Sequence, residues 1–189
     1  MVAVSWFELI FALVILQRLI ELGIAKRNAA CIRALGGFEV GAEHYRWIVL
    51  LHASFFASLL LEAVERGQLN ATPALLPFTV FLLAQGLRIW CLRSLGRFWN
   101  TRIFILPGSD PVRRGPYRFL RHPNYTVVAL ELFSLPLAFG ALYTALLFSL
   151  LNALVLRVRI RIEERSLSEV TGYAEAMGNR PRFLPFSKK

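Results

Sequence analysis

Long apolar blocks, separated by short polar segments, dominate the chain. Four blocks are near or above the roughly 20 residues that a helix needs to span a bilayer. The last block divides at Phe139-Gly140-Ala141, which indicates a tight hairpin of two short helices. We therefore predict an all-α integral membrane protein, one domain over residues 1–189, with about five transmembrane helices over residues 4–25, 45–64, 73–92, 125–139 and 142–156.

Three polar segments separate or extend these helices. Residues 94–125, SLGRFWNTRIFILPGSDPVRRGPYRFLRHPNY, predict an irregular cytoplasmic loop that contains a short strand (TRIFIL) and a turn at residues 107–110. Irregular backbone at a bilayer edge must be satisfied by protein or water, so we expect this loop to pack on the helices or line a cavity. Residues 157–170, RVRIRIEERSLSEV, predict a helical extension of the fifth span into the cytoplasm, and Gly36-Gly37 predicts a flexible loop after the first helix.

Composition and charge agree with a membrane protein. The 189 residues are 56% hydrophobic with a net charge of +10, and their mean hydropathy is +0.52. With five spans, one side of the membrane carries Lys26, Arg27, Arg33, seven arginines over residues 93–121 and eight basic residues over 157–189, whereas the other carries only Arg66. This asymmetry predicts an N-terminus outside and a C-terminus in the cytoplasm. The excess charge reflects topology and attraction to anionic membrane lipids rather than nucleic-acid binding.

Several common kinds of site are excluded by the residues present. Cys31 and Cys91 match no metal or redox spacing, and the chain contains no HExxH, P-loop or GxGxxG motif. No metal is therefore expected. A cofactor would have to bind at the arginine-rich cytoplasmic face.

The densest group of candidate residues is GPYRFLRHPNY, residues 115–125. Pro123 suits the first position of a helix, so the fourth span should begin here with free backbone N–H groups. Such a start, flanked by Arg118, Arg121 and His122, is a good site for a carboxylate. The alternative is that the arginines are topological anchors, and that the tyrosines belong to the interfacial aromatic belt.

A second group lies in the basic tail, where Glu163 and Glu164 are adjacent. Carboxylates suit ribose hydroxyls or an ammonium group. Arg159 and Glu163 are four residues apart and can pair on one helical face. The alternative is a solvated, ion-paired helix surface.

A third group consists of polar residues within the spans, where ionisable groups are costly and usually face one another or a watery cavity. They are Arg18, Glu21, His52, Gln85, Arg88, Glu131 and Asn152. Pairing of Arg18 with Glu21, or of Arg88 with Glu131, would also serve a purely structural role. Glu62 lies close to the outer surface, and we expect no special role for it.

GPYRFLRHPNY, followed about forty residues later by RIRIEERSL, resembles the isoprenylcysteine carboxyl methyltransferase family of membrane enzymes. The resemblance runs from about Leu87 to the tail. The stretches QRLIELGIAKRN, SLGRFWNTRIFILPG and FSLLNALVLRVRIRIEE are similar to a bacterial subgroup that O-methylates alkylpyrones and alkylresorcinols. This similarity implies a location in a bacterial inner membrane. Many members place a glycine two positions after the tyrosine of the motif, where this chain has Val127. This difference affects the expected substrate more than the expected cofactor.

The resemblance implies S-adenosylmethionine as methyl donor, bound at the cytoplasmic end. Its motif positions correspond here to Tyr117, Arg121, His122, Pro123, Tyr125, Glu163 and Glu164. The lipophilic acceptor would enter sideways from the bilayer. A hydroxyl acceptor benefits from a base, and we expect His122 in that role.

Other polar residues are candidates for holding the acceptor. Arg88, Arg121 and Gln85 are candidates for positioning its oxygen, with Arg18 and Glu131 beside them. Two alternative reactions are methylation of a prenylcysteine carboxylate and of an amine lipid. A non-enzymatic membrane scaffold or lipid-binding protein is a third reading. A sterol reductase is disfavoured because that group has more spans.

Overall fold

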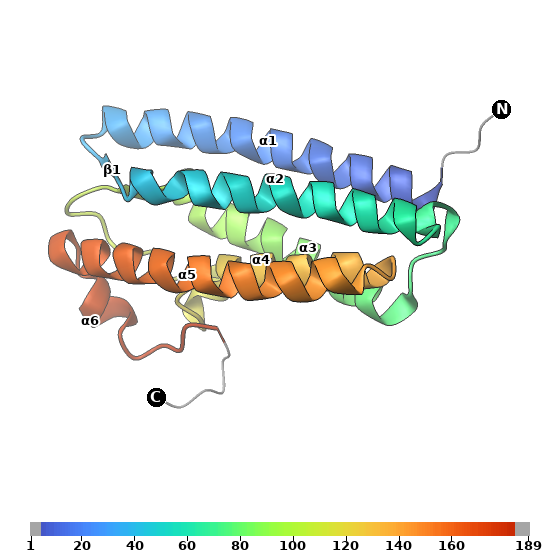
Figure 1. The fold of residues 1–189 in the computed structure, drawn as a ribbon. Coiled ribbons are helices and arrows are strands. Elements are labelled where there is room, and N and C mark those ends of the chain that lie inside the picture. Colours follow the sequence, from blue (N-terminus) through green and yellow to red (C-terminus); the bar gives the residue numbers. More distant parts are fainter. Residues whose placement is uncertain (1–4, 184–189) are drawn as a thin grey trace.

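The computed structural model describes residues 5–183, which are mostly helical (Figure 1). The elements are α1 (Trp6–Ala34), β1 (Phe38–Val40), α2 (Ala42–Glu65), η1 (Gln68–Asn70), α3 (Leu75–Leu95), η2 (Gly96–Phe98), β2 (Ile103–Ile105), η3 (Gly115–Arg118), α4 (Pro123–Ala138), α5 (Leu142–Val170) and α6 (Tyr173–Met177). Val4, where the first predicted span starts, and Lys188 and Lys189 of the basic tail lie outside the described residues.

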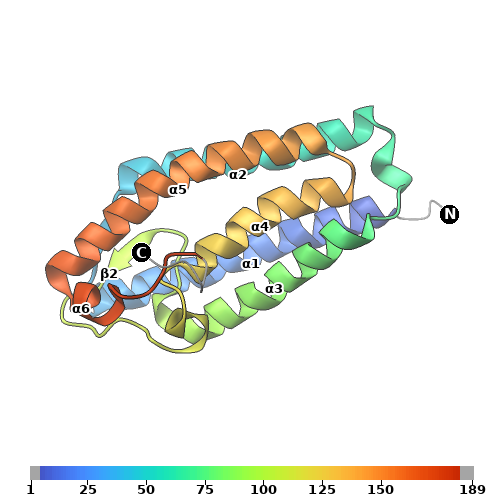
Figure 2. The same cartoon turned by 90° about the horizontal axis from the view of Figure 1, so that it is seen from below.

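The five long helices correspond to the five predicted apolar blocks and run along a common direction (Figures 1 and 2). α1 continues nine residues past the predicted end of the first span, to Ala34, so the stretch after Ala25 is helix. α5 runs without a break over 29 residues, which confirms the helical extension beyond residue 156. The predicted hairpin is also present, because α4 ends at Ala138, α5 begins at Leu142, and Gly140 turns the chain with a φ of +69°.

A two-stranded sheet corrects the prediction of a purely helical chain. β2 confirms the strand predicted in TRIFIL, and it pairs antiparallel with β1, with Phe38 opposite Ile105 and Val40 opposite Ile103. Gly36 and Gly37, expected to form a flexible loop, make the short connection from α1 to β1. Gly37 lies so close to the Ile105 carbonyl that a Cβ there would come within 2.8 Å of the oxygen. Strands of three residues are too short to show the alternation by which a sequence reveals them.

The packed core lies in the half of the bundle that holds the start of α1 and the α4–α5 hairpin. Its phenylalanines form a chain of edge and stacked contacts; for example, the Phe7 and Phe139 rings lie 5.1 Å apart at 87°. The other core residues there are Ile10, Val14, Leu51, Phe55, Leu59, Ala63, Phe81, Leu132, Leu135, Ala138, Ala141 and Phe148. The opposite half, toward β1 and α6, is partly hollow: a cavity lies beside a smaller buried cluster of Ala84, Cys91, Tyr117 and Val127.

Large apolar side chains also cover the outside of the bundle. They include Leu13 and Leu16 of α1, Leu82 and Leu83 of α3, and Leu150 of α5. A soluble monomer rarely exposes so much contiguous apolar surface. Two segments, Ala42–Glu65 and Leu75–Phe98, are long and apolar enough to cross a membrane by length and composition.

Candidate active site

A cavity of about 560 Å³ fills the hollow half of the bundle. Its polar end lies at the start of α4, the exit of α5 and α6, and its other end extends between α1 and α2. The polar end is lined by Ser109, Asp110, Tyr117, Arg121, His122, Tyr125, Arg159, Glu163, Tyr173 and Met177. The helical end is lined by Ile15, Arg18, Leu19, Glu21, Leu22, Ile48, Val49, His52, Phe56, Arg88, Val128, Asn152 and Val155.

The GPY part of the motif fits a tight contact with α3. Gly115 has a φ of +57°, a conformation that residues with a side chain rarely adopt. A Cβ at Gly115 would come within 1.9 Å of the Ser94 hydroxyl. The turn η3 that follows buries Tyr117 against the cavity. The glycine therefore lets the loop approach α3 closely enough to place this tyrosine.

The start of α4 places His122 and Pro123 as the sequence predicts. His122 is the N-cap residue and Pro123 is the first helical residue. The His122 Nε2 lies 2.9 Å from Glu164 Oε1. A carboxylate can only accept a hydrogen bond, so Nε2 carries a proton and is the donor of this hydrogen bond. The neutral imidazole therefore has its lone pair on Nδ1.

Glu164 is held by three cationic or hydrogen-bonding neighbours rather than facing the cavity. Arg121 lies 3.0 Å and Arg182 2.6 Å from its oxygens, in addition to His122. Partial burial alone would raise the pKa of Glu164, but the hydrogen bonds from His122 and Arg182 and the charge of Arg121 lower it to about 2. Among the described residues, Glu164 does not line the cavity. Its observed contacts are those of a residue that orients His122 and Arg121.

Glu163, in contrast, lines the cavity and is bridged to Arg159 by Tyr125. The Tyr125 hydroxyl donates to Glu163 Oε2 at 2.5 Å and accepts from Arg159 Nε at 2.7 Å. Arg159 also donates to the Thr101 carbonyl at 2.8 Å. The direct Arg159–Glu163 pair predicted from their spacing is replaced by this bridge within residues 5–183, because Tyr125 lies between the two side chains.

The segment after α6 closes the polar end from outside. Backbone N–H groups of Arg121 and His122 donate to the carbonyls of Pro181 and Arg182, at 3.0 and 3.1 Å. Arg180 donates to the Tyr117 carbonyl at 3.0 Å. These backbone contacts take up N–H groups next to the start of α4, where the sequence predicts a site for an anion. No motif in the sequence marked this segment.

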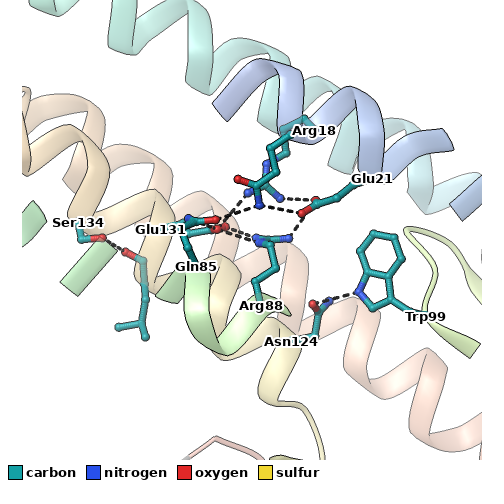
Figure 3. A network of polar contacts seen from close by, with 10 residues as sticks. Arg18, Glu21, Gln85, Arg88, Trp99, Asn124, Glu131 and Ser134 are labelled. Atoms are coloured by element: carbon teal, nitrogen blue, oxygen red, sulfur yellow. Dashed lines mark hydrogen bonds and ion pairs between the residues drawn. The ribbon is translucent and has the colours of Figure 1, made fainter. Parts of the chain in front are cut away.

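A buried ionic network lies along the helical end of the cavity (Figure 3). Arg88 of α3 donates to Glu131 of α4 through two nitrogens and to Glu21 of α1 at 3.2 Å. Arg18 bridges the same two carboxylates, at 2.6 Å from Glu21 and 3.0 Å from Glu131. Gln85 donates to Glu131 at 2.7 Å. Both predicted pairs are present, and the two arginines and two glutamates balance in charge.

The comparisons with known proteins agree with the motif. The sequence model of the isoprenylcysteine carboxyl methyltransferase (ICMT) family matches residues 75–169. The chain belongs to this family. "Uncharacterized protein YpbQ" of Bacillus subtilis (strain 168) is 40% identical over 163 residues, 86% of this chain and 97% of that protein. An "Uncharacterized protein" of Haemophilus influenzae (strain ATCC 51907 / DSM 11121 / KW20 / Rd) is 26% identical over 166 residues, 87% of this chain and 96% of that protein.

Membership of the ICMT family implies a membrane methyltransferase that uses S-adenosylmethionine. The polar end of the cavity fits such a donor by its chemistry. Buried polar atoms without a hydrogen-bond partner in the described residues include the hydroxyls of Tyr117 and Tyr173 and Nε of Arg121, all from residues that line the cavity. Burial raises the pKa of both tyrosines, so both hydroxyls stay protonated and can donate. Buried polar groups normally have partners, and unpaired ones at a cavity call for a polar ligand.

The structure brings most, but not all, of the predicted site residues to this cavity. Tyr117, Arg121, His122, Tyr125, Glu163, Arg18 and Arg88 line it. Gln85 and Pro123 lie behind the wall in the described structure, and Glu131 lines a second cavity of about 20 Å³. Tyr173, Met177 and Ser109 were missed, because the segments that carry them show no motif. His52 was noted only as a buried polar residue, yet it lines both cavities.

Proposed function

We propose that the protein O-methylates a lipophilic acceptor of the alkylpyrone or alkylresorcinol type, with S-adenosylmethionine as donor. One observation carries the proposal: a single cavity joins the family's motif residues to a region lined by apolar side chains of α1 and α2. Its polar end suits a charged donor, and the apolar side chains of its helical end suit a long hydrocarbon chain. A scaffold or lipid-binding role offers no reason for both ends to share one cavity.

The residues at the polar end match the charged groups of the donor. Glu163 offers a carboxylate to the ammonium group or the ribose hydroxyls. Arg121, whose Nε lacks a partner among the described residues, and Tyr117 offer donors to the carboxylate or the adenine. Glu164 holds Arg121 and His122 in place from behind. Bound S-adenosylmethionine supplies an electrophilic methyl group on a sulfonium, and these side chains hold it in one orientation and exclude water.

The helical end of the cavity is open toward the outside of the bundle. Leu19 and Leu22 of α1 and Val49 of α2 line the cavity and are nevertheless 59%, 47% and 49% exposed. A hydrocarbon chain can therefore reach the cavity between α1 and α2 without leaving the bilayer. Arg88, which is buried, and Arg18, which is partly buried, lie at this end and would attract the acidic oxygen of the acceptor.

The proposed orientation in the membrane follows from the same arrangement. The start of α1 lies at the end of the bundle opposite β1 and α6 (Figure 1). With α1–α5 as five crossings, the N-terminus lies outside, and the polar end of the cavity faces the cytoplasm, where the donor is made. Basic residues concentrate at that end.

Two measurements on detergent-purified protein test the function. Titration calorimetry should show binding of S-adenosylmethionine, and Glu163→Gln should weaken it about tenfold, which corresponds to about 1.4 kcal/mol. Glu175→Gln serves as the control, because Glu175 is an exposed carboxylate on α6. Labelled donor should then transfer its methyl group to a long-chain alkylresorcinol or alkylpyrone.

The outcomes separate the competing functions. Binding of the donor with transfer only to a farnesylated cysteine carboxylate, or only to an amine lipid, would replace the proposed acceptor. Folded protein that binds no donor would favour a scaffold or lipid-binding role.

A further inference from the structure

His52 lies deep in the helical end of the cavity, and the proposed function gives it no role. It is the eleventh residue of α2, about 15 Å along the helix axis from Ala42 at 1.5 Å per residue. It lines both the main cavity and the smaller one that Arg18 and Glu131 also line. The charged groups that face it are Arg18 of α1, Arg88 of α3 and Glu131 of α4.

The hydrogen bond of His52 determines its tautomer. Its Nδ1 lies 2.8 Å from the carbonyl oxygen of Ile48, one turn earlier in α2. A carbonyl only accepts, so Nδ1 carries the proton, and in the neutral ring the lone pair is on Nε2. Within residues 5–183, Nε2 has no hydrogen-bond partner and is not among the buried polar atoms left without one. An unpaired basic nitrogen is therefore presented toward the cavity.

The other titratable groups at the helical end of the cavity cannot take up a proton as readily as His52. Arg18 and Arg88 are already protonated. Glu21, which also lines the cavity, is ion-paired with both arginines. His122, which the sequence predicts as the base, keeps a lone pair on Nδ1, but it stands at the polar end of the cavity, with Nε2 committed to Glu164. His52 is thus the neutral base beside the place where the acceptor's polar head would lie.

We propose that His52 is the proton acceptor for a hydroxyl-bearing lipid, a phenol or an enol, that binds with its oxygen between Nε2 and Arg18. A carboxylate acceptor is already ionised and needs no such group, whereas a phenol or enol does. This inference rests on the proposed methyltransferase function and deepens it by identifying the residue that takes up the hydroxyl proton of the acceptor.

The step balances in atoms and charge. The acceptor oxygen forms the new O–CH₃ bond while the C–S bond of the donor breaks, and the electron pair of that bond stays on sulfur. The hydroxyl proton passes to Nε2. The positive charge that was on the sulfonium is then on the His52 imidazolium, close to the Glu131 carboxylate. Release of that proton to water restores the neutral ring for the next turnover.

The test compares His52→Gln with wild type and with His44→Gln. His44 is an exposed histidine near the start of the same helix, so it controls for loss of a histidine from α2. Methylation of an alkylresorcinol by H52Q should fall about 10²- to 10⁴-fold in kcat/KM, the usual contribution of a general base. H44Q should match wild type. Calorimetry should give the same donor affinity for all three proteins.

Three further readouts distinguish a base from a structural residue. The wild-type rate should fall at low pH as the base becomes protonated, and H52Q should lack this dependence. Added imidazole should restore part of the activity of His52→Ala. Without any donor, an alkyl nitrophenol bound to wild type should show more nitrophenolate absorbance than when it is bound to H52Q.

An incorrect role for His52 and an incorrect proposed function would give different results. H52Q that keeps the wild-type rate, or that loses donor affinity together with activity, overturns the role of His52. Wild-type protein that binds donor yet methylates no phenol or enol overturns the proposed acceptor, and this result needs no variant.

Discussion

Single side chains at the polar end of the cavity connect charges that would otherwise be unpaired. The Tyr125 hydroxyl receives a hydrogen bond from Arg159 and gives one to Glu163. The ring of Tyr125 stacks on His122 with centroids 5.3 Å apart. One phenol thus aligns two elements of the site, the start of α4 and the exit of α5.

Removing this hydroxyl should affect both stability and donor binding. We expect Tyr125→Phe to lower the free energy of unfolding by about 1.5–3 kcal/mol, the usual range for hydrogen bonds to charged groups. Donor affinity should also fall, because Glu163 loses the contact that orients it. Denaturant unfolding in detergent and calorimetry measure the two effects. The control is Tyr143→Phe, at an exposed tyrosine, and an equal loss in both variants would contradict the role of the bridge.

The sequence predicted several residues of the site but not their partners. The RHPNY letters and the late Glu-Glu pair marked His122, Tyr125 and Glu163, because polar residues are conspicuous in an apolar chain. That Glu164 binds Arg182, or that Tyr125 comes between Arg159 and Glu163, depends on how distant segments meet. Spacing along one helix cannot show an intervening side chain from another.

At the scale of elements, Glu62 joins the end of α2 to the start of α5. Its carboxylate accepts from the backbone N–H groups of Tyr143 and Thr144, at 3.1 and 2.8 Å, and from the Thr144 hydroxyl at 2.8 Å. Arg66 lies 3.0 Å from the same carboxylate. The expectation that Glu62 has no special role was wrong. It caps a helix whose own N-cap residue, Ala141, has no side-chain donor or acceptor.

Loss of this cap should loosen the α4–α5 hairpin. We expect Glu62→Ala to cost about 1–2 kcal/mol in the free energy of unfolding, as for other helix caps, because two backbone N–H groups are left unpaired. The matched control is Glu65→Ala, at an exposed position three residues later in the same helix. Hydrogen exchange at Tyr143 and Thr144 should quicken in the first variant only; unchanged exchange there would exclude a capping role.

How firmly the segment after α6 is held should depend on pH, because its residue Arg182 is ion-paired with Glu164. The pKa of this carboxyl is lowered from 4.5 to about 2 in the folded protein, so its contribution to stability is complete above about pH 4.5 and is lost as the pH falls toward 2. Limited proteolysis between residues 178 and 183 should therefore become faster over this window. Glu164→Gln should be susceptible at all pH values, and a wild-type segment equally protected at pH 2.5 and 6 would contradict the prediction.

At the scale of the whole molecule, one half of the bundle is packed and the other half is hollow. The packed half consists of aromatic and aliphatic side chains from all five long helices. The hollow half is closed by the two-stranded sheet, α6 and the final segment. A rigid base under an open site is a suitable arrangement for holding two ligands in line.

The proposed topology can be tested with the native cysteines. Cys31, near the strand end of α1, is exposed, whereas Cys91 is buried. A membrane-impermeant maleimide should label Cys31 in inside-out vesicles but not in intact spheroplasts. Cys31→Ser should abolish the labelling. Labelling of intact spheroplasts would reverse the orientation in which the polar end of the cavity faces the cytoplasm.

The sequence alone determined where the five long helices lie, because apolar blocks of bilayer length and Gly140 or Pro123 at their ends are local signals. Among the described residues, α2 and α3 qualify as candidate membrane spans by length and hydropathy. α4 has only 16 residues, and α1 carries Arg18 and Glu21 within its apolar stretch. The sequence also marked the motif residues of the methyltransferase family.

Only the tertiary structure decided which of those residues share a cavity. The bridge at Tyr125, the cap by Glu62, the pairing of β1 with β2 and the placing of His52 beside Arg18 all join residues far apart in the chain. Such contacts result from the packing of whole helices, and short-range spacing carries no information about them.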